Sequence, residues 1–429
     1  MKKLLIIGYV WPEPKSSAAG SRMMELIELF HANHWRIVFA SASALSKHRA
    51  DLSAFGVQEQ PIILNDSSFN DFIGELNPAV VLFDRFFTEE QFGWRVEQMC
   101  PDALRILDTE DLHSLRHVRQ QYLRQGQKQA ATEDERQRVG PVLIETVELY
   151  QRMTEDDMAQ REIASIYRCD LSLIISQFEM NLLADCFSIP KPLLQYCPFL
   201  KNTMQVHGVL PGFSDRQHFI SIGNFRHEPN WDAVLYLKHA IWPFIRSSLP
   251  DVELHVYGAY TPPKAMQLHS PKQGFYIKGW ADDALQVMRR ARVCLAPLRF
   301  GAGIKGKLMD AMRVGTPSVT TSIGAEAMCG NRPWGGQIEN ETQAFAEAAV
   351  QLYVDEVQWL KAQQRGFGIL THYFAQDDYA HLLIERIFQL KENLAQERQQ
   401  NFVGTLLRHH FHKSTQYMSR WIEAKNKNP

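Results

Sequence analysis

The sequence lacks the features that mark several common protein classes. Its 429 residues include only six cysteines, and no two of them form a CxxC pair. They are scattered along the chain, several in apolar runs, at Cys100, Cys169, Cys186, Cys197, Cys294 and Cys329. This pattern argues against a disulfide framework and predicts reduced core residues of a cytoplasmic protein.

Long apolar runs and an excess of one charge are missing as well. No apolar run approaches the ~20 residues that span a bilayer. The N-terminal run LLIIGYV is followed at once by PEPKSS, so we expect a first strand there and no signal peptide. The formal net charge of −2 gives no reason to expect a nucleic acid or a strongly anionic membrane as the main partner. Peripheral attachment to the inner face of a membrane stays open, and the sequence does not indicate the oligomeric state.

Motifs typical of two cofactor and metal sites are also absent. There is no GxGxxG fingerprint, which argues against a dinucleotide-dependent dehydrogenase. The acidic run Glu155–Asp157 lies in a helical stretch and makes no convincing DxD metal motif. We therefore expect neither a metal nor another cofactor.

What the sequence does contain is a repeated alternation of short apolar runs and helical patterns. This alternation predicts parallel sheets with crossover helices. It restarts after a polar, Pro-bearing stretch, and 429 residues are too many for one ordinary core. We expect an α/β protein of two Rossmann-like domains, residues 1–200 and 201–375, that face each other across a cleft. A helix at 376–394 would cross back to the first domain, and a basic amphipathic tail would follow at 395–429.

Two segments have no clear role in this scheme. Residues 115–167 are expected to be helical, with a break near Gly140 and Pro141, and they carry no chemistry that we can interpret. The tail mixes basic, histidine and apolar residues, which is compatible with a helix on a membrane surface. We favour a solvated helix packed on the second domain, because charged runs usually lie on solvated faces.

The most informative segment is Val293–Met328. Its pattern predicts a buried strand (VCLAPL), a glycine-rich loop (RFGAGIKGK), a helix (LMDAMRV) closed by Gly315, and a second strand (PSVTT). Such a βαβ unit presents the loop and the helix N-terminus at the carboxyl edge of a parallel sheet. Glycines let backbone N–H groups approach an anion, and Lys305 and Lys307 add positive charge. We interpret the loop as an anion site suited to a diphosphate, with Lys307 as the preferred cation.

A second cluster follows the predicted strand LRIL. The segment DTEDLHSLR holds Asp108, Glu110, Asp111, His113 and Arg116. Acid–base side chains crowded at a strand end are expected in a catalytic cleft. A zinc site is disfavoured because hard carboxylates dominate this cluster. A helix N-terminus decorated with acids is the alternative.

The loop WPEPKSSAAGSR after the first strand is a third candidate. Its small residues, including Ser17 and Gly20, allow a ligand to come close and a helix to begin. A plain connecting turn is the alternative. Glu162 and Glu179 flank a later strand and are more simply interpreted as structural hydrogen-bonding residues.

In this order, the segments resemble the retaining nucleotide-sugar glycosyltransferases of the GT-B fold, close to family 4. The resemblance covers residues 1 to about 392 and is strongest where FISIGNFRHEPN, VELHVYG, FYIKGWADD and the lysine-bearing loop follow one another. The first of the family's two loop carboxylates is absent, since Ala302 stands in its place, and Asp310 replaces the second. The chain is similar to a subset that carries a GxGxKxK loop instead.

The resemblance implies roles for individual residues of the second domain. Backbone groups of Gly301 and Gly303 would contact the donor, Lys305 and Lys307 its diphosphate, and Asp310 the ribose.

Further implied roles concern both domains. Arg226, with His227 beside it, would face the donor diphosphate, and Glu326 the sugar or the phosphates. The turn GWADD would hold the nucleobase through backbone groups, unless Asp282 simply caps a helix. His113, with Asp111 as the next choice, would contact the donor sugar or the acceptor. The loop with Ser17 and Gly20 would border the acceptor and the donor phosphates.

The implied reaction moves a sugar from a nucleotide-diphosphate donor to a hydroxyl of a glycan, lipid or protein, with retention and without a metal. His113, Asp111 and Lys307 would be its catalytic residues, and bacterial cell-surface polysaccharide or glycolipid assembly its commonest setting. Two alternatives stay open. A nucleotide-sugar 2-epimerase of the same fold would use the DTEDLH cluster as acid and base. A non-catalytic nucleotide-sugar-binding or regulatory subunit would explain the missing loop carboxylate.

Overall fold

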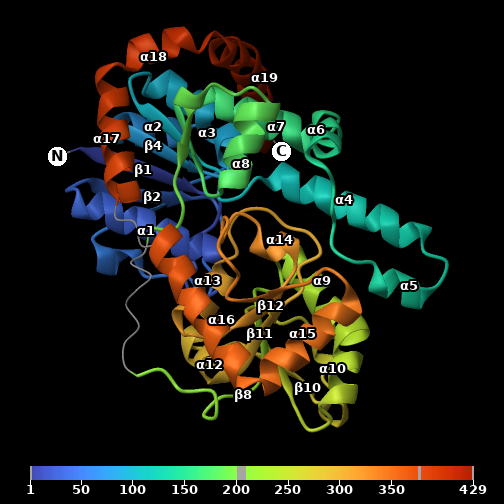
Figure 1. Cartoon of the computed structure of the whole chain (residues 1–429). Helices are drawn as coiled ribbons and strands as arrows, with labels where there is room; N and C mark the ends of the chain where they lie inside the picture. Colours follow the sequence, from blue (N-terminus) through green and yellow to red (C-terminus); the bar gives the residue numbers. More distant parts are fainter. Residues whose placement is uncertain (1, 201–208, 375–377, 428–429) are drawn as a thin grey trace.

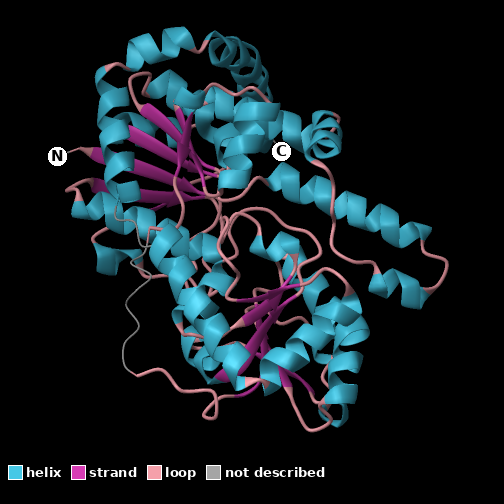
Figure 2. Ribbon diagram, viewed as in Figure 1, coloured by secondary structure: helices cyan, strands magenta, loops and turns pink. Residues whose placement is uncertain are grey.

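The computed structural model describes residues 2–200, 209–374 and 378–427. Two domains each contain one parallel sheet covered by helices on both faces (Figures 1 and 2). The expected α/β architecture of two Rossmann-like domains is confirmed. Along the described chain, no helix is both long enough and apolar enough to cross a membrane.

The first sheet has seven parallel strands in the order β3-β2-β1-β4-β5-β6-β7. These strands are β1 (Lys3–Gly8), β2 (Arg36–Ser41), β3 (Gln58–Pro61), β4 (Val80–Asp84), β5 (Leu104–Asp108), β6 (Leu171–Ile174) and β7 (Leu194–Tyr196). Strand β1 explains why the strands are continuous apolar runs in the sequence. Leu5 and Ile7 pack in the core on one face of the sheet, whereas Leu4 and Ile6 pack in the core on the opposite face.

The sequence did not predict β3 and β7. Both are short, β3 lies at one edge of the sheet with the sequence QEQP, and β7 lies at the other edge within the Pro-bearing segment. Edge strands pair on one side only, so neither an apolar run nor the absence of proline is required of them.

The helices of the first domain are α1 (Ala18–Ala32), α2 (Ser68–Leu76), α3 (Phe86–Met99), α4 (His113–Gln129), α5 (Glu133–Arg138), α6 (Thr146–Thr154), α7 (Asp157–Arg168) and α8 (Gln177–Asn181). Helices α4 and α5 form an arm that reaches over the second domain (Figure 1). Leu123 of α4 and Val142, within the non-helical segment between α5 and α6, pack against Phe300 of the second domain. The segment without interpretable chemistry is therefore a bridge between the domains.

The second sheet has six parallel strands in the order β10-β9-β8-β11-β12-β13. These strands are β8 (Gln217–Ile222), β9 (Leu254–Tyr257), β10 (Phe275–Gly279), β11 (Ala291–Ala296), β12 (Ser318–Thr320) and β13 (Gly336–Ile338). Its helices are α9 (Glu228–Tyr236), α10 (Trp242–Ser248), α11 (Pro263–Met266), α12 (Ala284–Arg290), α13 (Gly306–Arg313), α14 (Ser322–Ala325), α15 (Thr342–Val354) and α16 (Glu356–Ile369). Gly315 follows α13 with a φ of +65°, as the sequence predicts for a residue that ends a helix.

Both sheets reverse their strand order beside their first strand, at β1 and β4 and at β8 and β11. A crevice forms at the carboxyl ends of the strands at such a point. The two crevices belong to one cleft, because its lining includes the loops that follow β1, β4, β8 and β11.

The C-terminal helices α17 (Asp378–Glu392), α18 (Leu394–Gln400) and α19 (Phe402–Lys427) lie on the first domain (Figure 1). Leu383 and Ile387 of α17 share a core cluster with Phe30 and Trp35. The expectation that the tail packs on the second domain is wrong, since α19 contacts α3 and α7. The physical reason is that α17 has already returned the chain to the first domain, where carboxylates pair with basic residues of the tail.

Candidate active site

A cleft of about 940 Å³ lies between the carboxyl edges of the two sheets. Its walls are the loops after β1, β4 and β5 in the first domain and the loops after β8, β9, β10 and β11 in the second. Every site residue that the sequence predicts lines this cleft except Glu326. The structure therefore brings together segments that lie up to about three hundred positions apart in the sequence.

The glycine-rich loop after β11 is held by the first domain. The Gly303 N–H donates to Glu179 Oε1 at 2.8 Å, and the Gly301 carbonyl accepts from Arg119 at 2.8 Å. Gly303 has a φ of +63°, and a Cβ added there would lie 2.8 Å from Cβ of Asp111. In this structure the Gly303 N–H is engaged by Glu179 of the first domain, and its expected contact with the donor stays a prediction.

Lys305 stabilises the loop from inside. Its ammonium is buried and donates to the Gly303 carbonyl at 2.7 Å. Burial lowers the pKa of Lys305, and the attraction of Glu326 only partly offsets this. Lys305 lies on the cleft wall, but its ammonium is engaged within the loop.

Lys307 lies in the first turn of α13 and is the more available cation. Its ammonium donates to Asn230 Oδ1 at 2.6 Å, and burial lowers its pKa to about 8. In the part of the chain that the structure describes, no carboxylate pairs with it. Asn230 Nδ2 in turn donates to the Asn224 carbonyl at 3.1 Å, so the amide is fixed. A charge that meets only a neutral partner, at a helix N-terminus, suits an anion.

Asp310 and Glu326 differ in their availability. Asp310, one turn beyond Lys307 on α13, is half-buried on the cleft wall and pairs with Arg313 at 3.2 Å. Glu326, just after α14, forms a bidentate pair with Arg119 of α4 at 2.6 and 2.8 Å. This pair joins the domains and lies outside the cleft lining, and the expected contact of Glu326 with sugar or phosphate stays a prediction.

Asp111, His113 and Arg116 meet on the opposite wall. Arg116 donates to the Asp111 carboxylate and, at 3.1 Å, to His113 Nδ1. Because Nδ1 accepts, Nε2 carries the proton, and it lies 3.6 Å from Asp111 Oδ1. Burial, and next the Arg116 charge, hold the pKa of His113 well below its usual range. Burial would raise the pKa of Asp111, but Arg116 and His113 lower it further than burial raises it. The cluster thus presents an ionised carboxylate and a neutral imidazole.

Asp84, Arg85 and Glu110 extend this wall, and sequence reasoning missed the first two. Arg85 and Glu110 have left-handed φ values of +70° and +64° at the ends of β4 and β5. Among the described residues, Asp84 Oδ1 and Arg85 Nε are buried without a hydrogen-bond partner and form an ion pair with each other at 3.6 Å. Burial and the charge of Asp108 raise the pKa of Glu110 well above its usual range. The sequence does offer a signal for these two residues, since Asp84 and Arg85 directly follow the apolar run VVLF.

Arg22 stabilises the same wall through a buried ion pair at the end of β5. It is buried, pairs with Asp108 at 2.8 Å and donates to the Cys197 carbonyl at 2.6 Å. The Coulomb attraction and hydrogen bonds of Asp108 raise the pKa of Arg22 although burial lowers it. The end of β5 is thereby fixed to the helix α1 and to the segment after β7.

The loop after β1 is shaped by its own packing. Ser17 Oγ accepts the Gly20 N–H at 3.0 Å and caps α1. A Cβ on Gly20 would lie 2.4 Å from the backbone of Glu13, so the glycine is needed for packing within the loop. The loop also contacts the second domain, where Asn224 Nδ2 donates to Ser16 Oγ at 3.0 Å.

Arg226 and His227 lie on the second-domain side of the cleft. Arg226 is exposed, with its guanidinium carbon 3.6 Å from the ring centroid of Tyr260. His227 is also exposed at the surface, and desolvation within the cleft and next the Arg116 charge lower its pKa. In the nearby GWADD turn, Asp283 and not Asp282 caps α12, since its Oδ1 accepts the Gln286 N–H at 3.0 Å.

Glu162 and Glu179 are hydrogen-bonding residues, as the sequence indicates. Glu162 accepts the N–H groups of His113 and Ser114 at 3.0 and 2.9 Å and so satisfies the start of α4. Glu179 Oε1 accepts from Leu112 as well as from Gly303. Within the described ranges, no group of three or more His, Cys, Asp or Glu side chains is arranged to hold a metal ion.

Comparison with known proteins relates the second domain to a family and the whole chain to a fold. Residues 216–355 match the family described as glycosyl transferases group 1. A solved sucrose-phosphate synthase from Thermosynechococcus elongatus has a TM-score of 0.63 and 14% identity, over 91% of this chain and 99% of that one. HepE from Anabaena, in complex with UDP and glucose, has a TM-score of 0.63 and 10% identity, over 92% and 100%.

TarM from S. aureus, whose structure contains UDP, has a TM-score of 0.63 and 8% identity, over 90% of this chain and 100% of that one. A search of curated proteins gave no match. At these identities the solved structures show the fold, and the family match lies on the domain that carries Lys307. The family match also supports glycosyl transfer from a nucleotide sugar. We conclude that the chain is a glycosyltransferase with the GT-B fold.

Proposed function

We propose that the protein is a retaining, metal-independent transferase of the GxGxKxK subset of family 4. It moves a sugar from a nucleotide-diphosphate donor to a hydroxyl of a glycan, lipid or protein acceptor. The observation that carries this proposal is the ammonium of Lys307, which has only a neutral partner among the described residues and lines the same cleft as the His113 cluster.

The second domain would hold the donor. The N-terminus of α13, Lys307 and the exposed Arg226 supply positive charge where a diphosphate leaves. Asp310 on the same helix is placed to accept ribose hydroxyls. UDP-sugars are the first donors to test, since UDP is bound in the structures of HepE and TarM.

In the reaction, the bond between the anomeric carbon and a phosphate oxygen breaks as the acceptor oxygen bonds to the same face of the sugar. The acceptor proton passes to the released phosphate oxygen. Lys307 stabilises the charge on the departing diphosphate. The neutral His113, with its Nε2–H, and the ionised Asp111 orient the sugar or acceptor hydroxyls.

We place the reaction in the cytoplasm, in the assembly of cell-surface polysaccharide or glycolipid. The six free cysteines, four of them buried, support a reducing compartment.

The test is a transfer assay with UDP-, GDP- and ADP-sugars and a crude glycan or lipid extract, with and without EDTA. We expect nucleoside diphosphate release that depends on the extract, persists in EDTA and yields the anomeric configuration of the donor. Epimerisation of the donor without an acceptor would identify an epimerase. Donor binding, detected by thermal shift, without hydrolysis or transfer would identify a regulatory subunit.

A further inference from the structure

Helix α19 buries a polar side. The residues that it presents to α3 and α7 are Gly404, Arg408, His412 and Ser419, all largely inaccessible to solvent. An amphipathic helix on a globular protein normally turns its apolar side inward. Here that arrangement is inverted.

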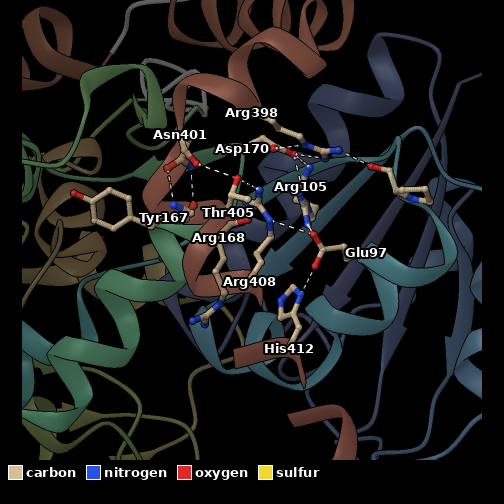
Figure 3. Close-up of polar contacts among 12 residues, drawn as sticks. Glu97, Arg105, Tyr167, Arg168, Asp170, Arg398, Asn401, Thr405, Arg408 and His412 are labelled. Atoms are coloured by element: carbon tan, nitrogen blue, oxygen red, sulfur yellow. Dashed lines mark hydrogen bonds and ion pairs between the residues drawn. The ribbon is translucent and has the colours of Figure 1, made fainter. Parts of the chain in front are cut away.

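Buried charges hold α19 in this orientation, as Figure 3 shows. Arg408 pairs with Glu97 of α3 at 3.2 Å, and His412 also bonds the Glu97 carboxylate. Just before α19, Arg398 forms a bidentate pair with Asp170 at 2.8 Å. A Cβ on Gly404 would lie 2.1 Å from the Tyr167 carbonyl, which shows how closely the helix approaches α7. Removing the helix would take two cationic partners, Arg408 and His412, from the carboxylates of α3, so its docking is specific.

The outward side of α19 is apolar and aromatic. Six of its large side chains are about half or more exposed, namely Phe402 (71%), Val403 (47%), Leu406 (47%), Tyr417 (67%), Met418 (59%) and Trp421 (59%). Leu406, Tyr417 and Trp421 fall on one side of the helix, because their spacings are close to whole turns. Tryptophan and tyrosine at such positions are characteristic of helices that lie at a membrane–water interface.

Basic residues surround this apolar side. Lys413, Arg420 and Lys425 are exposed. Across residues 402–427 the single acidic residue is Glu423, and its carboxylate already accepts from Ser67 and pairs with Lys427. The outer surface of the helix is therefore positive.

We propose that α19 docks the protein on a membrane surface that contains anionic lipid. The helix would lie in the plane of the interface, with its aromatic and aliphatic side chains at the acyl boundary and its cations among the headgroups. A second copy of the chain fits this surface less well, because it offers the same cations and no free carboxylate to pair with them. The proposal goes beyond the transfer reaction and does not depend on it.

The test measures binding of the full-length protein to vesicles by sedimentation. Vesicles are phosphatidylcholine alone or with added phosphatidylglycerol. We expect binding to the anionic vesicles, weakened by high salt. Replacing Lys413, Arg420 and Lys425 by glutamine should lower the partition coefficient about a hundredfold, since each cation near an anionic surface contributes about fivefold.

The pair Leu406→Gln and Trp421→Gln should lower the partition coefficient at least about tenfold. The matched control is Val357→Gln with Leu360→Gln on α16, which are similarly exposed at 60% and 44% and should leave binding unchanged. The proposal is overturned if the wild type does not bind anionic vesicles, or if the α19 variants bind as well as the wild type. It is equally overturned if Leu406→Gln with Trp421→Gln abolishes a dimer in sedimentation velocity while vesicle binding is unaffected.

Discussion

The two walls of the cleft differ in whether their charged side chains are paired with opposite charges. On the second-domain wall, the Lys307 ammonium meets the neutral amide of Asn230. On the first-domain wall, Asp108 is matched by Arg22 and Asp111 by Arg116. One wall thus keeps positive charge for a ligand, while the charges of the other satisfy one another. The difference teaches that an anion belongs on the second domain and that the first domain fixes the geometry of neutral groups.

The largest expected effect comes from breaking the balance of the first wall. Arg22→Met would leave the Asp108 carboxylate buried and unpaired, so we expect the free energy of unfolding to fall by about 3–5 kcal/mol. Urea unfolding followed by circular dichroism measures it. Arg36→Met, at an exposed arginine of β2, is the control and should change stability by less than about 0.5 kcal/mol. A loss below about 1 kcal/mol for Arg22→Met would show that the Arg22–Asp108 pair does not stabilise this wall.

The next largest effect is expected from removing the Lys307 charge on the second-domain wall. Lys307→Ala should lower kcat at saturating donor by more than about a hundredfold, about 3 kcal/mol of transition-state stabilisation, because the departing diphosphate loses a preorganised cation. Steady-state rates measure it, with Lys278→Ala at an exposed lysine of β10 as control. Wild-type turnover in Lys307→Ala would show that the lysine assignment is wrong.

A smaller effect tests the contact between the walls. Gly303→Ala forces a side chain into a φ of +63° and against Asp111, so we expect stability to fall by about 2 kcal/mol and donor affinity to weaken. Thermal unfolding and donor titration measure both. Gly368→Ala, where a Cβ would meet nothing within 4 Å, should be neutral or slightly stabilising. Equal stability of the two variants would mean that the walls separate readily.

The smallest expected effect is a pH dependence of donor binding, which tests the charge state of Lys307 on the second-domain wall. Burial lowers the pKa of Lys307 to about 8, so the ammonium is charged below that value and loses its proton as pH rises through it. The donor dissociation constant should therefore rise about tenfold per pH unit above about pH 8. Calorimetric titrations across this range measure the change. Lys307→Arg keeps its charge and should remove the dependence. A dependence that persists in Lys307→Arg would assign it to another group.

Much of the fold and part of the site follow from local sequence. Strand β11, the glycine-rich loop, α13 and β12 lie where their pattern predicts. The position of Lys307 at a helix N-terminus follows as well, because helix ends and glycine turns are decided within a few residues. The engagement of Glu326 by Arg119 does not follow, since the partner lies on a distant helix. Nor does the use of Gly303 by Glu179, because the sequence specifies a permissive backbone but not what approaches it.

The tail shows the same division. Its helical, amphipathic character follows from the order of its residues. Which side of the helix faces inward depends on the ion pair with Glu97 on α3. The sequence by itself determined which segments are strands and helices, and that a cationic loop ends a buried strand. Only the tertiary structure decided which charges remain free for a ligand. Local patterns depend on neighbours along the chain, whereas the state of a charge depends on burial and on partners that folding brings from elsewhere.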